Sequence, residues 1–272
     1  MYYIIPWFLT SLLYIPIFTQ LYSLRWQMID YTHAYFILPV TLWLVWRKRK
    51  FLTPDSSSSF LKTILYLLLL ILSLLLYLLG WRQDYLFITT FSMIPVCFGL
   101  VLFFYGKRTA RELLFPILYL LLLIPPPLGI LDSITLPMRY GVTFAADIIL
   151  KIFDIPVVRD GLLLSLGGNE IYMGEPCSGL RSLVTMFALG LVYAYLLPLN
   201  LKNKITLIIA IIPLALVGNL IRIVLTCATI YVWGPKIEEG PVHFLTGLVI
   251  FIIMIACFIN LEKRLEENEP DT

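Results

Sequence analysis

Charged residues are scarce in this sequence. They make up 14% of its 272 residues, whereas apolar residues make up 60%. This small polar fraction cannot cover the surface of a water-soluble globule of this size. The composition therefore excludes a soluble fold and predicts a polytopic membrane protein. The formal net charge is only +3, which gives no reason to expect a nucleic-acid partner.

Residues that bind metals are equally sparse. The chain has four cysteines and two histidines, and it contains no HExxH motif, no paired CxxC motif and no carboxylate cluster at ligand spacing. It also lacks a dinucleotide fingerprint and a phosphate loop. We therefore expect no metal, no cofactor and no disulfide framework. The cysteines inside apolar runs are expected to be small packing residues: Cys97, Cys227 and Cys257.

The apolar residues form runs as long as a helix must be to cross a hydrocarbon core of about 30 Å. We expect an all-α polytopic membrane protein with about eight transmembrane helices. Residues 1–272 are predicted to form one integral membrane domain that ends in a short charged tail at 261–272. The first run lacks a cationic leader and a cleavage site, so it is interpreted as a retained span. The expected spans are 3–22, 30–46, 61–80, 86–105, 113–131, 178–198, 205–233 and 242–260.

The loops between these runs differ in their content of lysine and arginine. Cationic residues cluster in alternate loops, at 47–50, 107–111, 202–204 and 263–264. Short loops rich in lysine and arginine remain in the cytoplasm. We therefore expect a protein of the cell membrane with both termini in the cytoplasm and with residues 132–176 as one long loop on the outer face.

The outer loop has two parts with different patterns. Residues 131–153 have the pattern of an amphipathic helix that lies along the membrane interface. Residues 154–176 read as two short extended segments joined near Gly167 and Gly168. Together these parts are expected to cover the outer end of the bundle and to keep water away from it.

A cysteine opens the sixth expected span, in the stretch EPCSGLRSL. Cys177 follows Pro176 near a helix N-terminus, and Arg181 comes one turn later. The helix dipole and the cation both favour the thiolate form of a cysteine in this position. Counting back from Lys202 at about 1.5 Å per residue places Cys177 at the outer end of its span. Cys177 is therefore a candidate nucleophile, and the alternative is a packing role.

An arginine lies inside the seventh expected span. This span is longer than a membrane requires, so the helix is either tilted or broken near the arginine. An arginine within a membrane helix costs about 2.5 to 3.5 kcal/mol on insertion scales. Arg222 follows Lys204 by roughly 27 Å of helix, so it reaches the outer boundary, where snorkelling to the interface is the alternative to function. Asn219 lies on the same helical face. A guanidinium suits an oxyanion clamp better than it suits proton donation.

Both histidines of the chain fall on the expected outer side. His243 opens the eighth span, and His33 opens the second. A lone histidine at an interface is more often structural than catalytic, so both are kept as candidates. Cys177, Arg222 and His243 are thus expected to meet at the outer face from three different helices.

Three motifs together resemble the exosortase/archaeosortase family of multi-pass membrane cysteine transpeptidases. EPCSGLRSL matches its Cys-Ser-Gly motif, GNLIRIVL at 218–225 its Asn-x-x-Arg motif, and HFLTG at 243–247 its third site. Weaker matches are DYTHAYFILPVTLWLVWRKRK, in which Ala34 replaces the usual glycine, and LLLIPPPLGILDSITLPMR. The resemblance extends from about residue 25 to 260, and a histidine at the third site indicates the bacterial-type branch.

The resemblance implies a thiol peptidase or transpeptidase, of the cysteine endopeptidase type. Its partners would be exported proteins that carry a C-terminal sorting signal, which consists of a short motif, a transmembrane helix and a basic tail. Cys177 would form an acyl-thioester, and the acyl group would pass to a lipid or glycan acceptor or to water. Arg222 would bind or protonate the intermediate, and His243 would stabilise the transition state or relay a proton. Supporting roles are expected at Arg181, Asn219, Ser178 and His33.

A different class of protein also fits part of the pattern. In a transporter or lipid flippase, Arg222 and Arg181 would form an outward-facing anion site, and Cys177 would be incidental. No internal repeat of the kind common in transporters is evident in the sequence. A transporter should tolerate Cys177→Ser, whereas a transpeptidase should not.

Overall fold

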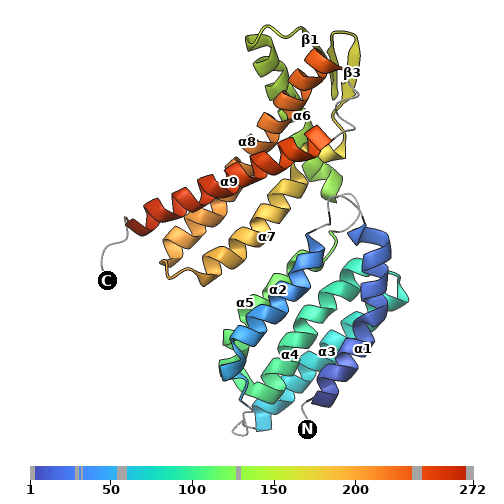
Figure 1. Ribbon diagram of the computed structural model, residues 1–272. Helices are drawn as coiled ribbons and strands as arrows, with labels where there is room; N and C mark the ends of the chain where they lie inside the picture. The colour runs from blue at the N-terminus through green and yellow to red at the C-terminus, as the bar shows by residue number, and fades with distance from the viewer. Residues whose placement is uncertain are drawn as a thin grey trace. The chain divides into compact units, whose positions relative to one another are not determined.

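The computed structural model describes residues 4–27, 31, 33–53, 60–126, 130–234 and 241–267 (Figure 1). The described residues are 83% helical, and they contain five helices long and apolar enough to cross a membrane. The predicted all-α polytopic membrane fold is therefore confirmed. The chain forms two compact units, Met1–Leu128 and Gly129–Thr272. The expectation of a single membrane domain stays a prediction.

The first unit is built from helices joined by short turns. These are α1 (Ile4–Leu21), which continues into the π-helical turn η1 (Tyr22–Trp26), α2 (Ala34–Arg47), η3 (Arg49–Phe51), α3 (Phe60–Arg82), α4 (Leu86–Glu112), α5 (Leu114–Tyr119) and η4 (Leu120–Leu123). Glycines allow α3 and α4 to approach closely. A Cβ on Gly99 would lie 2.8 Å from a methyl carbon of Leu70, and one on Gly80 would lie 2.7 Å from the backbone nitrogen of Thr89.

The predicted span 113–131 is much shorter in the structure than expected. The apolar helix runs only from Leu114 to Leu123, or about 15 Å. Its end is explained by the prolines that follow, because the residue before a proline is pushed out of the helical region. Ile124, which precedes Pro125, has φ −80° and ψ 119°.

The second unit carries a three-helix bundle and a small sheet. Its elements are α6 (Ile130–Ile152), β1 (Val157–Asp160), β2 (Leu163–Leu166), β3 (Asn169–Tyr172), η5 (Glu175–Ser178), α7 (Leu180–Leu196), α8 (Leu201–Trp233) and α9 (Pro241–Glu267). The long helix α8 packs against both α7 and α9 (Figure 1). Missing side chains permit these contacts, since a Cβ on Gly190 would collide with Ile211 and one on Gly218 with Met254.

Helix α8 is one continuous helix through Arg222. The alternative of a break near this residue is therefore wrong. At 33 residues α8 is about 50 Å long, which exceeds the thickness of a hydrocarbon core. The helix starts at an Asn200 cap, whose side-chain oxygen accepts a hydrogen bond from the Asn203 backbone at 2.8 Å. Its other end reaches the sheet, where a Cβ on Gly167 would lie 3.3 Å from the Tyr231 ring.

The predicted amphipathic helix at 131–153 is present as α6, but the following segment forms three strands instead of the two expected. They make an antiparallel sheet in the order β1-β2-β3. The additional reversal occurs at Gly161, whose φ of +60° allows a tight turn between β1 and β2. Gly167 and Gly168, with φ +55° and +88°, form the expected turn between β2 and β3, and two positive φ values suit a hairpin.

The sheet, α6 and α8 share one apolar core. Leu164 and Leu166 of β2 are fully buried in it, together with Ala146 of α6 and Ile230 of α8. Cys227 of α8 is completely buried in the same core, in agreement with its predicted packing role. Cys177 packs against the edge of this core, which links the sheet to the candidate nucleophile.

Candidate active site

Cys177 lies in the short turn η5, directly before α7. Its backbone N–H donates to the Gly174 carbonyl at 3.0 Å, and the residue is half-buried. Gly179 has a φ of +76°, a left-handed conformation that turns the chain from η5 into α7. The η5 turn also lies against α6 and α8. The structure therefore places the thiol where a helix begins, at a meeting point of three helices.

The serine that follows the cysteine holds the start of α7. Ser178 is buried, and its Oγ accepts a hydrogen bond from the Leu180 N–H at 3.2 Å. This N–H is one of those that a helix leaves unpaired at its first turn. The expected supporting residue Ser178 thus stabilises the segment that carries Cys177, and we assign its hydroxyl no nucleophilic role.

Asn219 of α8 fixes the same turn from the opposite side. Its Nδ2 donates to the Cys177 carbonyl oxygen at 2.9 Å, and its side chain is almost fully buried. A Cβ on Gly179 would lie 2.8 Å from Asn219 Cγ, so only glycine allows this approach. The Cys-Ser-Gly and Asn-x-x-Arg motifs are therefore in direct contact with each other. The sequence predicts that Asn219 lies on the same helical face as Arg222, but it does not predict this hydrogen bond.

Arg222 lies about one turn beyond Asn219 on α8 and is half-buried. Among the described residues, Cys177 and Arg181 lie close enough to Arg222 for their charges to interact with its guanidinium. The Arg181 side chain is exposed in the first turn of α7. The structure thus brings the predicted nucleophile and two predicted cations into one neighbourhood. This setting favours a thiolate and a developing oxyanion, because both are negatively charged.

The third motif runs beside Arg222. His243 falls in the first turn of α9, and its side chain lies outside the described part of the chain. Gly247, one turn later on α9, is described, and a Cβ on it would lie 4.0 Å from Arg222 Cδ. The backbone of His243 therefore lies one helical turn before the point at which α9 approaches Arg222. The catalytic role of His243 stays a prediction.

His33 belongs to the first unit. It is buried, its Nε2 lies 3.3 Å from the Leu122 carbonyl oxygen, and its ring stacks on Tyr31 with the ring centroids 5.9 Å apart. These contacts tie the start of α2 to η4, which is a structural function. A supporting catalytic role for His33 stays a prediction.

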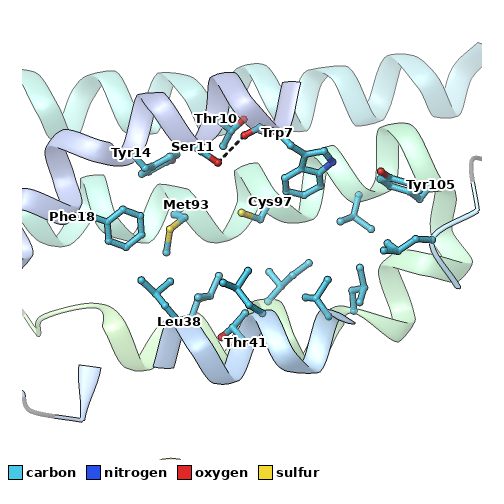
Figure 2. Close-up of a pocket in the computed structure, with 17 residues that line it drawn as sticks. Trp7, Thr10, Ser11, Tyr14, Phe18, Leu38, Thr41, Met93, Cys97 and Tyr105 are labelled. Carbon is cyan, nitrogen blue, oxygen red and sulfur yellow. Dashed lines mark hydrogen bonds between the residues drawn. The ribbon is translucent and has the colours of Figure 1, made fainter. Parts of the chain in front are cut away.

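A cavity of about 400 Å³ lies within the first unit between α1, α2, α4 and α5 (Figure 2). Cys97, Met93 and Tyr14 line it, and the described residues of its lining include no charged side chain and no histidine. The Ser11 hydroxyl donates to the Trp7 carbonyl of its own helix at 2.9 Å, so it is already paired. The cavity therefore suits hydrocarbon and lacks the cations that accompany Cys177.

The described residues contain no group of three or more histidine, cysteine or acidic side chains that could hold a metal ion. A family model described as transmembrane exosortase matches residues 26–259 of the chain. This range includes Cys177, Arg222 and His243. No curated protein and no solved structure matches the chain.

Proposed function

The chain belongs to the transmembrane exosortase family, and from this premise we propose that it cleaves C-terminal sorting signals of exported proteins through a thioester at Cys177. Membership of the family gives the protein a general role as a membrane transpeptidase or protease. The observation that carries the specific proposal is the hydrogen bond from Asn219 to the Cys177 carbonyl. Asn219 lies one turn before Arg222 on the same helix. It holds a candidate nucleophile next to a candidate anion-stabilising group.

In the proposed reaction the Cys177 thiolate attacks the carbonyl carbon of the scissile peptide bond. A bond from Sγ to carbon forms, and the carbonyl oxygen becomes an oxyanion. The carbon–nitrogen bond then breaks, the leaving amine takes a proton from His243, and an acyl-thioester remains on Cys177. A lipid or glycan hydroxyl, or water, attacks the thioester, gives up its proton to His243 and releases the thiolate.

Arg222 is proposed to stabilise the oxyanion. Its planar guanidinium offers parallel N–H donors, and its half-buried position strengthens their effect relative to water. Arg181 adds a second positive charge near the thiol, while Ser178 and Asn219 hold the backbone of η5 in place. The nucleophile and the oxyanion donor thus come from different helices whose contact is fixed by Gly179.

We place this chemistry, as a proposal, at the outer face of the cell membrane. Lys202 and Lys204 lie in the first turn of α8, whereas Arg222 lies about 30 Å farther along the helix. Cys177 lies just before the N-terminal end of α7, and this end is remote from the two lysines. If the lysines are cytoplasmic, as the distribution of cations indicates, then the site faces outward. A sorted protein anchored by its own transmembrane helix would present its scissile bond there.

The proposal is tested by replacing the nucleophile. Cys177→Ala and Cys177→Ser should both abolish processing of a co-expressed protein with a C-terminal sorting signal, because an unactivated hydroxyl is a far weaker nucleophile than a thiolate. Mass spectrometry of the processed C-terminus reports the cleavage position and the attached group. Cys257→Ser, at an exposed position of α9, is the matched control and should leave processing intact. Processing by either Cys177 variant would exclude the thioester mechanism.

A further inference from the structure

The cavity of the first unit is long and has no part in the proposed reaction (Figure 2). Its wall on α4 runs from Met93 to Tyr105, which is about 18 Å of helix. Half of a hydrocarbon core of about 30 Å measures about 15 Å, so the cavity is comparable in length to one leaflet of a membrane. Its volume of about 400 Å³ is in the range of small-molecule sites in proteins.

The described lining of this cavity offers a bound molecule hydrocarbon and few hydrogen bonds. The hydroxyls of Thr10 and Ser11 donate to carbonyls of their own helix, at 2.8 and 2.9 Å. The Tyr14 hydroxyl is hydrogen-bonded to the Ser92 hydroxyl at 2.7 Å. The Thr41 oxygen has no partner in the described part of the chain, but it is buried and gives a ligand nothing to contact. An occupant of the cavity must therefore be largely apolar.

The cavity is accessible from the side of the bundle, between α1 and α2. Helix α1 packs against α4, and α2 packs against α5 and η4. Ser11 of α1 and Leu42 of α2 both line the cavity, and both are exposed. Figure 2 shows α1 and α2 on opposite sides of the cavity, with Met93 and Cys97 of α4 between them. A hydrocarbon chain can therefore enter sideways from the membrane.

One end of the cavity lies beside a cluster of cations. Leu52 and Leu113 line this end, and they directly follow η3 and α4. The two segments are joined by an ion pair in which Lys48 Nζ lies 2.6 Å from a Glu112 carboxylate oxygen. Lys48 and Glu112 neutralise each other, so the remaining cations determine the charge of this end. The exposed cations of the two segments are Arg47, Arg49, Lys50, Lys107, Arg108 and Arg111.

Two tryptophans indicate that this end of the unit lies at a membrane interface. Trp43 and Trp46 are exposed, and the guanidiniums of Arg47 and Arg49 lie 5.6 and 4.2 Å from the centres of their rings. Tryptophan side chains are enriched at the headgroup level of membranes. Gly106, with φ +75°, ends the helical path of α4 at the same end of the cavity. The cations that follow Gly106 therefore lie at the level of lipid headgroups.

We propose that the first unit binds one anionic phospholipid of the cytoplasmic leaflet, with an acyl chain in the cavity and the phosphate between Arg49 and Arg111. Arg49 follows Lys48 and Arg111 precedes Glu112, so the Lys48–Glu112 ion pair brings the two arginine-bearing segments together. Guanidiniums bind phosphate oxygens through paired N–H donors. A zwitterionic headgroup would add a positive charge to a cluster that is already cationic, so the site favours an anionic lipid.

This lipid is distinct from an acceptor of the proposed reaction. The cations at 47–50 and 107–111 mark the expected cytoplasmic end of the helices, whereas an acceptor must reach the Cys177 thioester at the outer face. The inference therefore does not depend on the thioester chemistry. A lipid that occupies the cavity fills the space between α1 and α2, so it should stabilise the first unit by binding its folded state.

Native mass spectrometry of the purified full-length protein in detergent counts bound lipids and gives their dissociation constants. The unmutated protein should bind one dioleoylphosphatidylglycerol about 10-fold more tightly than dioleoylphosphatidylcholine, and the first lipid should raise its melting temperature more. Cys97→Phe places a ring in the cavity and should weaken this binding about 10- to 100-fold. Leu38→Trp fills the cavity from α2 and should do the same. Cys257→Phe, at an exposed cysteine of α9, is the matched control and should retain the tight site.

The headgroup contact is tested separately from the cavity. Arg49→Gln combined with Arg111→Gln should weaken binding of phosphatidylglycerol about 10- to 30-fold and leave binding of phosphatidylcholine unchanged. Lys202→Gln combined with Lys204→Gln removes two cations from the first turn of α8 and is the matched control. This control should retain the preference for phosphatidylglycerol, because it leaves the cluster of the first unit intact.

Three results would overturn the inference. The first is an equal dissociation constant for the two lipids, and this comparison decides even where a variant fails to fold, because it uses the unmutated protein. The second is a tight site that persists in both cavity-filling variants. The third is glycerol phosphate that binds as tightly as phosphatidylglycerol, which would assign the cations to a soluble anion. A processed substrate that carries phosphatidylglycerol would identify the lipid as the acceptor and contradict a resident role.

Discussion

Asn219 acts on the backbone of the nucleophile and not on its thiol. Its amide donates to the Cys177 carbonyl oxygen, and the contact is possible because Gly179 has no side chain. A carbonyl oxygen that loses its partner inside a protein costs about 1 to 3 kcal/mol. Asn219 therefore contributes to stability and positions Cys177 at the same time.

Replacing Asn219 should separate these effects from chemistry at the thiol. Asn219→Asp places a negative charge against the Cys177 carbonyl, so it should lower the melting temperature more than Asn219→Ala does. Both variants should slow substrate processing because the turn is no longer held. The thermal unfolding of the purified proteins in detergent measures the first effect. Equal stability of the unmutated protein and Asn219→Asp would contradict the hydrogen bond.

Arg222→Lys tests the oxyanion clamp. An ammonium keeps the charge but cannot reproduce two parallel donors, so processing should fall about 100- to 1000-fold. Alkylation of Cys177 by iodoacetamide should proceed at nearly the unmutated rate, because the positive charge beside the thiol is retained. Arg181→Lys, at the exposed cation, should change both rates little. A parallel fall in alkylation and processing for Arg222→Lys would mean that Arg222 acts by favouring the thiolate.

At the scale of the elements, glycines determine how closely the helices approach. The contact at Gly218 is with the flexible Met254 side chain, whereas the contact at Gly80 includes the backbone nitrogen of Thr89 at 2.7 Å. A flexible side chain can move aside or be shortened, but backbone can yield only if a helix shifts. The two close approaches should therefore respond differently to compensating substitutions.

Gly218→Ala should destabilise the protein by about 1 to 3 kcal/mol through overpacking, and Met254→Ala in the same chain should restore part of the loss. Gly80→Ala should destabilise it at least as much, and Thr89→Ala should not rescue it, because the contact with the Thr89 backbone nitrogen remains after the hydroxyl is removed. Unfolding of both double variants in detergent supplies the comparison. Full rescue at Gly80, or none at Gly218, would show that this account of the helix contacts is incorrect.

For the whole molecule, the sequence predicted most of what depends on length and composition. The runs of apolar residues located the long helices, and helical rise alone placed Cys177 and Arg222 at the same level. Contacts that depend on geometry were not predictable. The Asn219 hydrogen bond needs the positive φ of Gly179, which sequence spacing does not reveal. Amphipathic patterning also could not show that the polar side of α6 faces protein, because the outward side of a membrane protein is apolar.

The proposed orientation is a property of the whole chain and is tested by labelling. Single cysteines replace Asp160 in β1, Asn169 in β3 or Lys202 in α8, in a variant whose native cysteines are alanine. Membrane-impermeant maleimide should label the first two positions in intact cells, because α7 and α8 place the sheet and the lysine end of α8 far apart. The cysteine at Lys202 should react only after the cells are lysed. Labelling of that cysteine alone in intact cells would reverse the orientation and place Cys177 in the cytoplasm, where an exported substrate would not yet present its cleavage site.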